Sequence, residues 1–333
     1  MLLNGGVRAP ALRFLKISTR IHEARSHSRY PVDMKLRGCG TALVTPFGRD
    51  GAVDERALRS LIEWQISAGV HFLVPCGTTG ETPTLSREEW LRAIDIAIEV
   101  TNRRVPIVAG ATSNATAEAV ERAQAVAARR GVDAILTASP YYNKPTQEGQ
   151  YQHFKAIAEA VDKPLVLYNV PGRTSANIEP ATLARLAKIN NIIAVKEASG
   201  SMTQIAEVLN VVPDDFIVLS GDDAITLPLI SLGGQGIISV ASNLIPAELS
   251  KMTQAALEGD WTGARKLHRK YLPLMQALFL ESNPMPVKCV LAMMGRIEER
   301  YRLPMLPVKP ETRSKLEHVA AAFGLLAERM AAR

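Results

Sequence analysis

The chain has 333 residues, of which 47% are hydrophobic and 22% are charged, a composition typical of a globular protein with a sizeable core. The formal net charge is +6, and residues 1–33 supply +4 of it, from six Lys and Arg side chains against two acids. The rest of the chain is almost balanced, which argues against nucleic-acid binding. No apolar run reaches about 18 residues, so no transmembrane helix and no membrane partner are expected.

Residues 1–33 are basic, poor in acids and without clear hydrophobic periodicity. An organelle transit peptide or a nucleic-acid-binding tail would fit this composition. We predict a flexible extension, or an upstream start codon chosen by mistake, because termini are often disordered and Met34 begins a segment that looks like a natural start. The three cysteines, Cys39, Cys76 and Cys289, show no CxxC spacing, so we expect no metal site and a reducing, cytoplasmic location.

From Gly40 onward, short apolar strands alternate with amphipathic helices. The expected strands are 41–47, 71–76, 105–110, 133–140, 164–170, 191–198, 216–221 and 236–240. The expected helices are 57–69, 86–100 and 116–131, followed by helices that begin near Gln147, Pro180, Ser201, Asp222 and Pro246. Ser86 and Glu89 form a capping box at the start of the second helix.

Eight βα units predict an α/β fold, a (β/α)8 TIM barrel. A doubly wound open sheet is the alternative, but it needs a glycine-rich phosphate loop after the first strand, which TPFGRDG lacks. Three more helical stretches follow, at 261–281, 284–296 and 309–331. We therefore divide the chain into a flexible extension (1–33), a barrel (34–258) and a C-terminal helical extension (259–333) that could cover the barrel or make subunit contacts.

Barrel active sites lie at the carboxyl ends of the strands, and Lys196 ends the sixth one. A lysine is unexpected in a buried strand, because burying an ammonium is costly. Burial favours the neutral amine, which can attack a ketone and give an imine. The alternative is a lysine paired with Glu197, although neighbours in a strand point to opposite faces.

Other polar side chains follow the remaining strand ends. Tyr168 could move protons and Arg173 could bind a carboxylate, unless they are a core tyrosine and a surface arginine. The segment GTTGE (77–81) could hold a small carboxylate with free N–H groups and hydroxyls, or could be an ordinary glycine turn. Tyr141 and Tyr142 could serve the local pocket and a partner, or could simply pack.

Six motifs in this order resemble the pyruvate-dependent class I lyase family: GTTGE, SPYYNKPTQEG, YNVPGRT, AVKEASG, SGDD and NPMPVK. The resemblance covers about residues 36–330. It implies a Schiff base on Lys196, with Tyr168 moving protons and with Thr78 and Tyr142 completing a relay, Tyr142 from a neighbouring subunit. It also implies substrate contacts from Thr79, Ile238, Gly221 and Arg173.

The resemblance implies condensation of pyruvate with L-aspartate 4-semialdehyde, a step of lysine and diaminopimelate biosynthesis, without a cofactor. It also implies a homo-oligomer, a dimer of dimers. Lyases of the same family that act on N-acetylneuraminate or another sugar acid are the alternative, but they tend to have serine in place of Thr78 and to lack Arg173. A non-catalytic barrel would have no need to keep the lysine, tyrosine and threonines.

Many relatives bind lysine as a feedback inhibitor at a subunit interface, and Asn114, Glu118 and Tyr141 match that effector site. Arg87 and Trp90 stand where some bacterial enzymes have histidines, and Thr82 replaces a serine. An arginine close to a bound lysine ammonium would repel it. The sequence therefore leaves lysine inhibition open.

Overall fold

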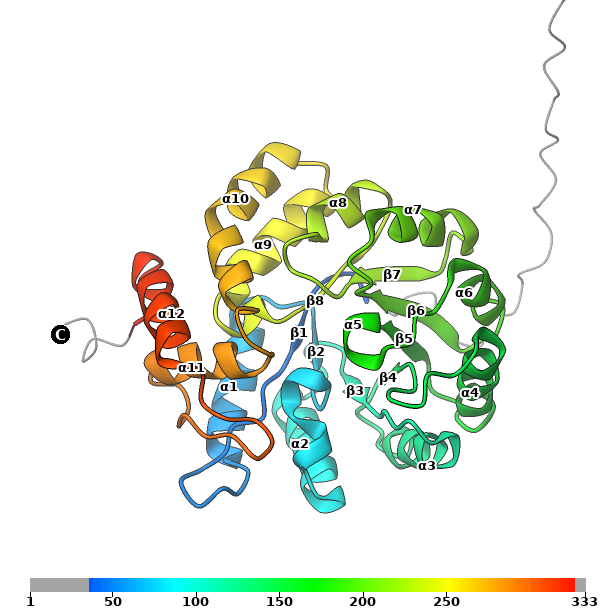
Figure 1. Ribbon diagram of the computed structural model, residues 1–333, viewed down its shortest axis with the longest axis horizontal. Helices are drawn as coiled ribbons and strands as arrows, with labels where there is room; N and C mark the ends of the chain where they lie inside the picture. The colour runs from blue at the N-terminus through cyan, green and yellow to red at the C-terminus, as the bar shows by residue number, and fades with distance from the viewer. Residues whose placement is uncertain (1–35, 327–333) are drawn as a thin grey trace, which may run out of the picture.

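A computed structural model describes residues 36–326, so the predicted N-terminal extension (1–33) and the part of the predicted last helix beyond residue 326 lie outside the described residues. Parallel strands form a ring that is surrounded by helices (Figure 1). The strands are β1 (Gly38–Ala42), β2 (Phe72–Val74), β3 (Val108–Gly110), β4 (Ala134–Ala138), β5 (Leu165–Asn169), β6 (Ile192–Glu197), β7 (Ile217–Ser220) and β8 (Gly236–Ser239).

The sheet has eight strands in the order β2-β1-β8-β7-β6-β5-β4-β3. Its two ends, β2 and β3, meet through a parallel bridge between Leu73 and Ile107. Two backbone hydrogen bonds accompany the bridge, from Leu73 N to Pro106 O (2.9 Å) and from Gly110 N to Pro75 O (3.0 Å). The bridge closes the ring, and the predicted TIM barrel is confirmed.

Alternate residues of each strand face opposite ways, and each side has its own apolar cluster. The interior cluster includes one or more residues from every strand of the ring: Ala42, Phe72, Val74, Val108, Ala134, Leu136, Ala138, Val166, Tyr168, Ala194, Leu219 and Ile238. The outer cluster packs the strands against the helices, with Leu73, Ile135, Leu167, Val195 and Val218 among its members. This alternation decides which side chain of each strand end enters the barrel.

The surrounding helices are α1 (Glu55–Ser67), α2 (Arg87–Thr101), α3 (Thr116–Ala127), α4 (Gln147–Glu159), α5 (Pro171–Thr174), α6 (Pro180–Leu186), α7 (Met202–Val211), α8 (Thr226–Ser231) and α9 (Pro246–Leu257). The capping box of Ser86 and Glu89 is present at the start of α2. The short α5 is absent from the sequence prediction, and α8 begins at Thr226 rather than near Asp222. Helix α3 ends at Ala127, four residues before the Gly131 that the sequence suggests as its end.

The first strand is predicted at 41–47, but it spans Gly38–Ala42. Glycine is a poor strand former, yet Gly40 packs so closely on β2 that an added Cβ would lie 2.0 Å from the Phe72 ring. The glycines of this segment therefore argue against a strand, although the close packing between β1 and β2 requires glycine at this position. The apolar residues after Ala42 form the loop that carries Thr45 and Phe47 at the carboxyl end of the barrel.

Three more helices follow the barrel: α10 (Trp261–Ala277), α11 (Met285–Met293) and α12 (Pro310–Ala322). They lie on one side of the ring, with α10 against α8 and α9, α11 against α12 and the 3-10 turn η3 (Ala241–Asn243), and α12 against α10 (Figure 1). The division of the chain at residues 258 and 259 stays a prediction. Within residues 36–326, no helix is long and apolar enough to cross a membrane.

Candidate active site

Lys196 lies in β6 on the face that enters the barrel, in register with Tyr168 of β5. Only 5% of Lys196 is exposed, and its Nζ lies 4.2 Å from the centre of the Tyr168 ring. Burial lowers the pKa of the Lys196 amine to about 7, an effect that Asp223 opposes and Arg173 reinforces. A large share of the amine is therefore neutral and nucleophilic near neutral pH.

Glu197 does not pair with Lys196, so that alternative is wrong. Its carboxylate faces away from the barrel interior and accepts hydrogen bonds from Asn169 Nδ2 (3.0 Å) and from the backbone N–H of Ser199 (2.7 Å). The strand geometry is the reason, since successive side chains point to opposite faces. Lys196 therefore enters the interior without a directly paired carboxylate.

Tyr168 is buried beside the lysine, and its hydroxyl shares a hydrogen bond with the Thr78 side chain. Burial raises the pKa of the Tyr168 phenol to about 12, against the opposing effects of Arg173 and of the Thr78 hydrogen bond. The phenol is thus protonated at neutral pH and able both to donate and to accept a hydrogen bond. A catalytic proton donor and acceptor needs this property.

Thr78, Thr79 and Gly80 form the 3-10 turn η1 (Thr78–Gly80) after β2. The backbone N–H groups of Gly80 and Glu81 donate within the turn, to Gly77 O (3.0 Å) and Thr78 O (3.2 Å). The predicted nest of free N–H groups is therefore wrong for these two residues, because the turn uses them itself. Carboxylate binding would fall to the two threonines.

Arg173 lies at the barrel mouth in α5, and its Nη2 donates to the backbone oxygen of Asn283 (3.1 Å). Its charge lowers the pKa values of both Lys196 and Tyr168, so it acts on the same site rather than on a remote surface. The Asn283 side chain in turn donates to Thr79 Oγ1 (2.9 Å). Asn283 therefore joins two of the predicted substrate contacts.

Gly221 and Ile238 complete the predicted set. A Cβ on Gly221 would lie 3.1 Å from Lys196 Cε and 2.6 Å from the Cβ of Ala198, so any larger residue would crowd the lysine. Ile238 lies in the interior cluster with Tyr168. The fold thus brings Lys196, Tyr168, Thr78, Thr79, Arg173, Gly221 and Ile238 to one end of the barrel.

Two residues of the site escape the sequence prediction. Asn283 belongs to the NPMPVK motif and reaches the site from the segment before α11. Asp223 ends the SGDD motif and is buried, where it accepts hydrogen bonds from Ser239 Oγ (2.5 Å) and from two backbone N–H groups, those of Val240 and Ala241 (3.1 Å each). Burial raises the pKa of the Asp223 carboxyl, and its charge favours the ammonium form of Lys196. The motifs themselves were the signal that could have identified both residues.

Tyr142 lies apart from this cluster. It follows β4 in the left-handed backbone region (φ 73°), and 88% of its surface is exposed, against 40% for Tyr141. A side chain this exposed makes few contacts within its own chain. The chain alone therefore does not bring Tyr142 into the cluster around Lys196.

The predicted effector residues Asn114 and Tyr141 lie in the loops after β3 and β4, and Glu118 lies in the first turn of α3. Asn114 Nδ2 donates to the backbone oxygen of Tyr141 (3.2 Å), whereas Glu118 lines a separate cavity of about 240 Å³ together with Arg87 and Trp90. Glu118 accepts hydrogen bonds from Ser113 and Arg122, both at 2.8 Å. Trp90 is buried and its indole donates to Gly110 O (3.0 Å). Most of the polar groups around this cavity therefore already have partners within the chain.

The model of the dihydrodipicolinate synthetase family matches residues 35–323. The chain belongs to this family. Proteins named 4-hydroxy-tetrahydrodipicolinate synthase from Koribacter versatilis and Acidobacterium capsulatum are 73% and 58% identical to it, over 88% and 89% of this chain and 98% of each relative. The family and the lyase class predicted from the motifs are confirmed.

Solved structures agree with this assignment. The chloride-inhibited dihydrodipicolinate synthase from Acinetobacter baumannii, complexed with pyruvate, has a TM-score of 0.85 and 44% sequence identity to this chain. The match covers 87% of this chain and 99% of that one. The barrel and the C-terminal helices are therefore shared with enzymes of the family.

Proposed function

We propose that the chain condenses pyruvate, held as a Schiff base on Lys196, with L-aspartate 4-semialdehyde to give 4-hydroxy-tetrahydrodipicolinate. The observation that carries the proposal is the buried Lys196 amine at the carboxyl end of the barrel, with a pKa of about 7 and with the Tyr168 ring 4.2 Å away. The names of the relatives support the reaction, and the pyruvate in the A. baumannii structure supports the first substrate.

In the proposed mechanism, the neutral Lys196 amine adds to the ketone of pyruvate, and loss of water gives the imine. The imine carbon draws electrons from the methyl group, which loses a proton and becomes an enamine. The enamine carbon then forms a C–C bond with the aldehyde carbon of the second substrate. The C=O π bond breaks, the aldehyde oxygen takes a proton and becomes a hydroxyl, and the nitrogen on Lys196 returns to the imine. Finally, the amine of that substrate attacks the imine carbon and displaces Lys196 as the ring closes.

We assign the proton transfers to Tyr168, whose phenol is protonated at neutral pH and shares a hydrogen bond with Thr78. Thr79, Gly221 and Ile238 would contact the part of the Schiff base that comes from pyruvate, since all three lie near Lys196 at the carboxyl end of the barrel. Arg173 would anchor the carboxylate of the aldehyde substrate, because its guanidinium lies at the mouth and suits bidentate binding. The mechanism uses side chains alone, and we propose no cofactor.

We propose that Tyr142 completes the relay in the site of a second copy of the chain. Its exposure of 88% and its left-handed backbone suit a side chain held outward toward a partner. A dimer is the smallest assembly that satisfies this role, and we propose a dimer of dimers. Since Cys39, Cys76 and Cys289 are all free thiols, we also propose a reducing, cytoplasmic location.

A trapping experiment tests the shared chemistry of the family. Borohydride reduction in the presence of pyruvate should leave a covalent adduct on the peptide that contains Lys196, as read by mass spectrometry. Lys196→Met should abolish the adduct. Lys163→Met is the matched control, because Lys163 is also partly buried but donates to Val132 O (2.8 Å) outside the proposed site. An adduct that persists in Lys196→Met would refute the assignment.

A coupled assay separates this function from that of a sugar-acid lyase. Purified protein is given pyruvate and L-aspartate 4-semialdehyde, and a downstream reductase consumes the product. Turnover in this assay, without cleavage of N-acetylneuraminate, is the expected result. Cleavage of N-acetylneuraminate without condensation would overturn the proposed substrate.

A further inference from the structure

A buried ion pair joins two motifs that lie 207 residues apart in the chain. Glu81 ends the GTTGE motif, and Lys288 ends the NPMPVK motif within α11. Lys288 Nζ lies 2.5 Å from Glu81 Oε1, and the two side chains are 0% and 1% exposed. The proposed mechanism uses neither residue.

We propose that Lys288 is a positioning residue, which acts through Glu81 to hold the turn that presents Thr78 and Thr79 to pyruvate. This inference rests on the proposed function, because it assumes that the turn contacts the substrate. Lys288 would not touch the substrate itself. It would determine where the two threonine hydroxyls lie.

The contacts of the turn support a positioning role. Glu81 follows the turn directly and adopts the left-handed backbone region (φ 52°), a conformation that is uncommon for residues other than glycine. Gly80 O accepts from Thr45 Oγ1 (2.7 Å), and Thr79 Oγ1 accepts from Asn283 Nδ2 (2.9 Å). Two residues of the turn, Thr79 and Gly80, and the residue that follows it, Glu81, are thus held by side chains from elsewhere.

Packing alone does not account for charges at this position. The Lys288 ammonium lies 4.2 Å from the centre of the Phe47 ring and 5.2 Å from that of Tyr301. A buried ion pair is generally no more stabilising than a well-packed apolar pair, because desolvation offsets the attraction. An ion pair does fix the direction and distance between its two side chains. A site that must place the hydroxyls of Thr78 and Thr79 requires this.

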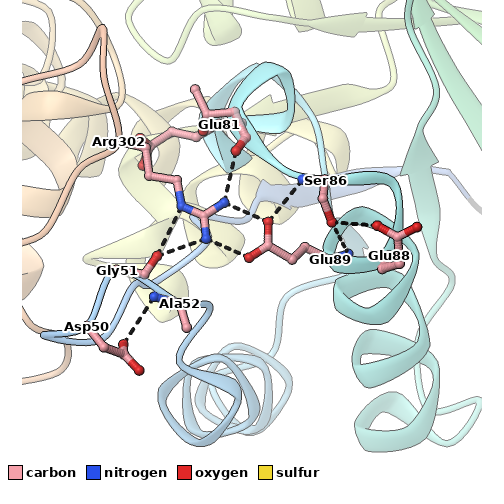
Figure 2. Close-up of polar contacts among 9 residues, drawn as sticks. Asp50, Gly51, Ala52, Glu81, Ser86, Glu88, Glu89 and Arg302 are labelled. Carbon is pink, nitrogen blue, oxygen red and sulfur yellow. Dashed lines mark hydrogen bonds and ion pairs between the residues drawn. The ribbon is translucent and has the colours of Figure 1, made fainter.

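Arg302 is a suitable residue for comparison with Lys288, because it is a second cation of the C-terminal region that pairs with a glutamate of the barrel. Its guanidinium also lies near Phe47, 4.4 Å from the ring centre, and it pairs with Glu89 through two contacts of 2.6 Å. It donates further to Gly51 O and to Thr84 O (2.9 Å), and Figure 2 shows this cluster with Glu81 close by. Arg302 therefore ties the same C-terminal region to α2 and to the segment after Glu81, whereas its own contacts do not include Thr78, Thr79 or Gly80.

The experiment compares Lys288→Met with Arg302→Met in the full-length protein. We expect Lys288→Met to raise the KM for pyruvate and to lower kcat, with a combined loss of about 100-fold in kcat/KM, because a displacement near 1 Å has effects of this size. Arg302→Met should lower Tm but leave the KM for pyruvate within about threefold of the wild-type value. Folded Lys288→Met protein with wild-type constants, or an equal kinetic loss in Arg302→Met, would overturn the proposal.

Lys288→Met leaves the Glu81 carboxylate buried without a partner, so the single variant could fail to fold. The double variant Glu81→Gln with Lys288→Met removes both charges, so it tests the positioning role even if the single variant does not fold. We expect its Tm to return toward the wild-type value while the KM for pyruvate stays about tenfold high. Wild-type kinetics in the double variant would overturn the positioning role. Absence of a pyruvate adduct on Lys196 in the wild-type protein would instead refute the proposed function.

Discussion

Formation of the pyruvate adduct on Lys196 should follow a titration with its midpoint near pH 7, because burial lowers the pKa of this amine from the ordinary 10.5 to about 7. Each pKa unit corresponds to about 1.4 kcal/mol, so the surroundings favour the neutral amine by about 5 kcal/mol. At pH 7, about half of the molecules would carry the neutral nucleophile, against roughly one in 3,000 for an exposed lysine. The neutral fraction, and with it the initial trapping rate, should therefore rise between pH 6 and pH 8 and then level off.

Two variants should move this midpoint in opposite directions. Asp223→Asn removes the negative charge that favours the ammonium and should lower the midpoint, whereas Arg173→Met removes a repelling cation and should raise it, each by about one unit. The assay is the initial rate of adduct formation with saturating pyruvate, read by mass spectrometry between about pH 5 and pH 10. A wild-type midpoint above about pH 9, or shifts of the same sign in both variants, would refute the electrostatic argument.

Three further outcomes follow from the site. Lys196→Met should raise Tm, and by more at pH 7 than at pH 10. The free-energy cost of burying this lysine is absent above its unfolded pKa of about 10.5 and grows as the pH falls toward 7. An unchanged Tm at pH 7 would refute this cost. Tyr168→Phe should lower kcat by at least about 100-fold in the coupled assay with little change in Tm, and activity within tenfold of wild type would exclude it as the main proton carrier. Free lysine should bind with a Kd above about 1 mM in calorimetry, because Arg87 lines the cavity and Glu118 is already paired with Arg122. A lower Kd would show that lysine displaces Arg122 from Glu118.

The sequence predicts the barrel well because its signal is repeated. Each buried parallel strand is a short apolar run, and each helix has its own periodicity, so an error at one element does not change the fold class. The first strand shows the limit of this reasoning. Gly38 and Gly40 look like strand breakers until the approach of β2 is known, because the contact with Phe72 comes from a residue more than thirty positions away in the chain.

In the site, too, some features follow from local sequence and others depend on contacts between distant residues. The position of Lys196 within an apolar strand is a local property, and strand alternation alone already makes a pair with Glu197 awkward. The contacts of Asn283 are not local, since its partner Thr79 lies 204 residues earlier. The fate of the N–H groups of Gly80 and Glu81 depends on whether the chain turns as a 3-10 helix, which residue types alone do not determine. Sequence patterns thus locate the groups that carry chemistry, whereas three-dimensional contacts decide how those groups are held.

The proposed chemistry depends on both faces of β6. Ala194 and Lys196 face the interior, where residues such as Leu219 and Ile238 exclude water and lower the pKa of the amine. Glu197 faces outward, and its carboxylate is occupied by Asn169 and Ser199. If this carboxylate reached the amine, it would stabilise the ammonium and remove the nucleophile at neutral pH. The strand therefore does more than place a lysine at the barrel mouth: its alternation keeps the neighbouring acid away, and this separation leaves a neutral amine available for pyruvate.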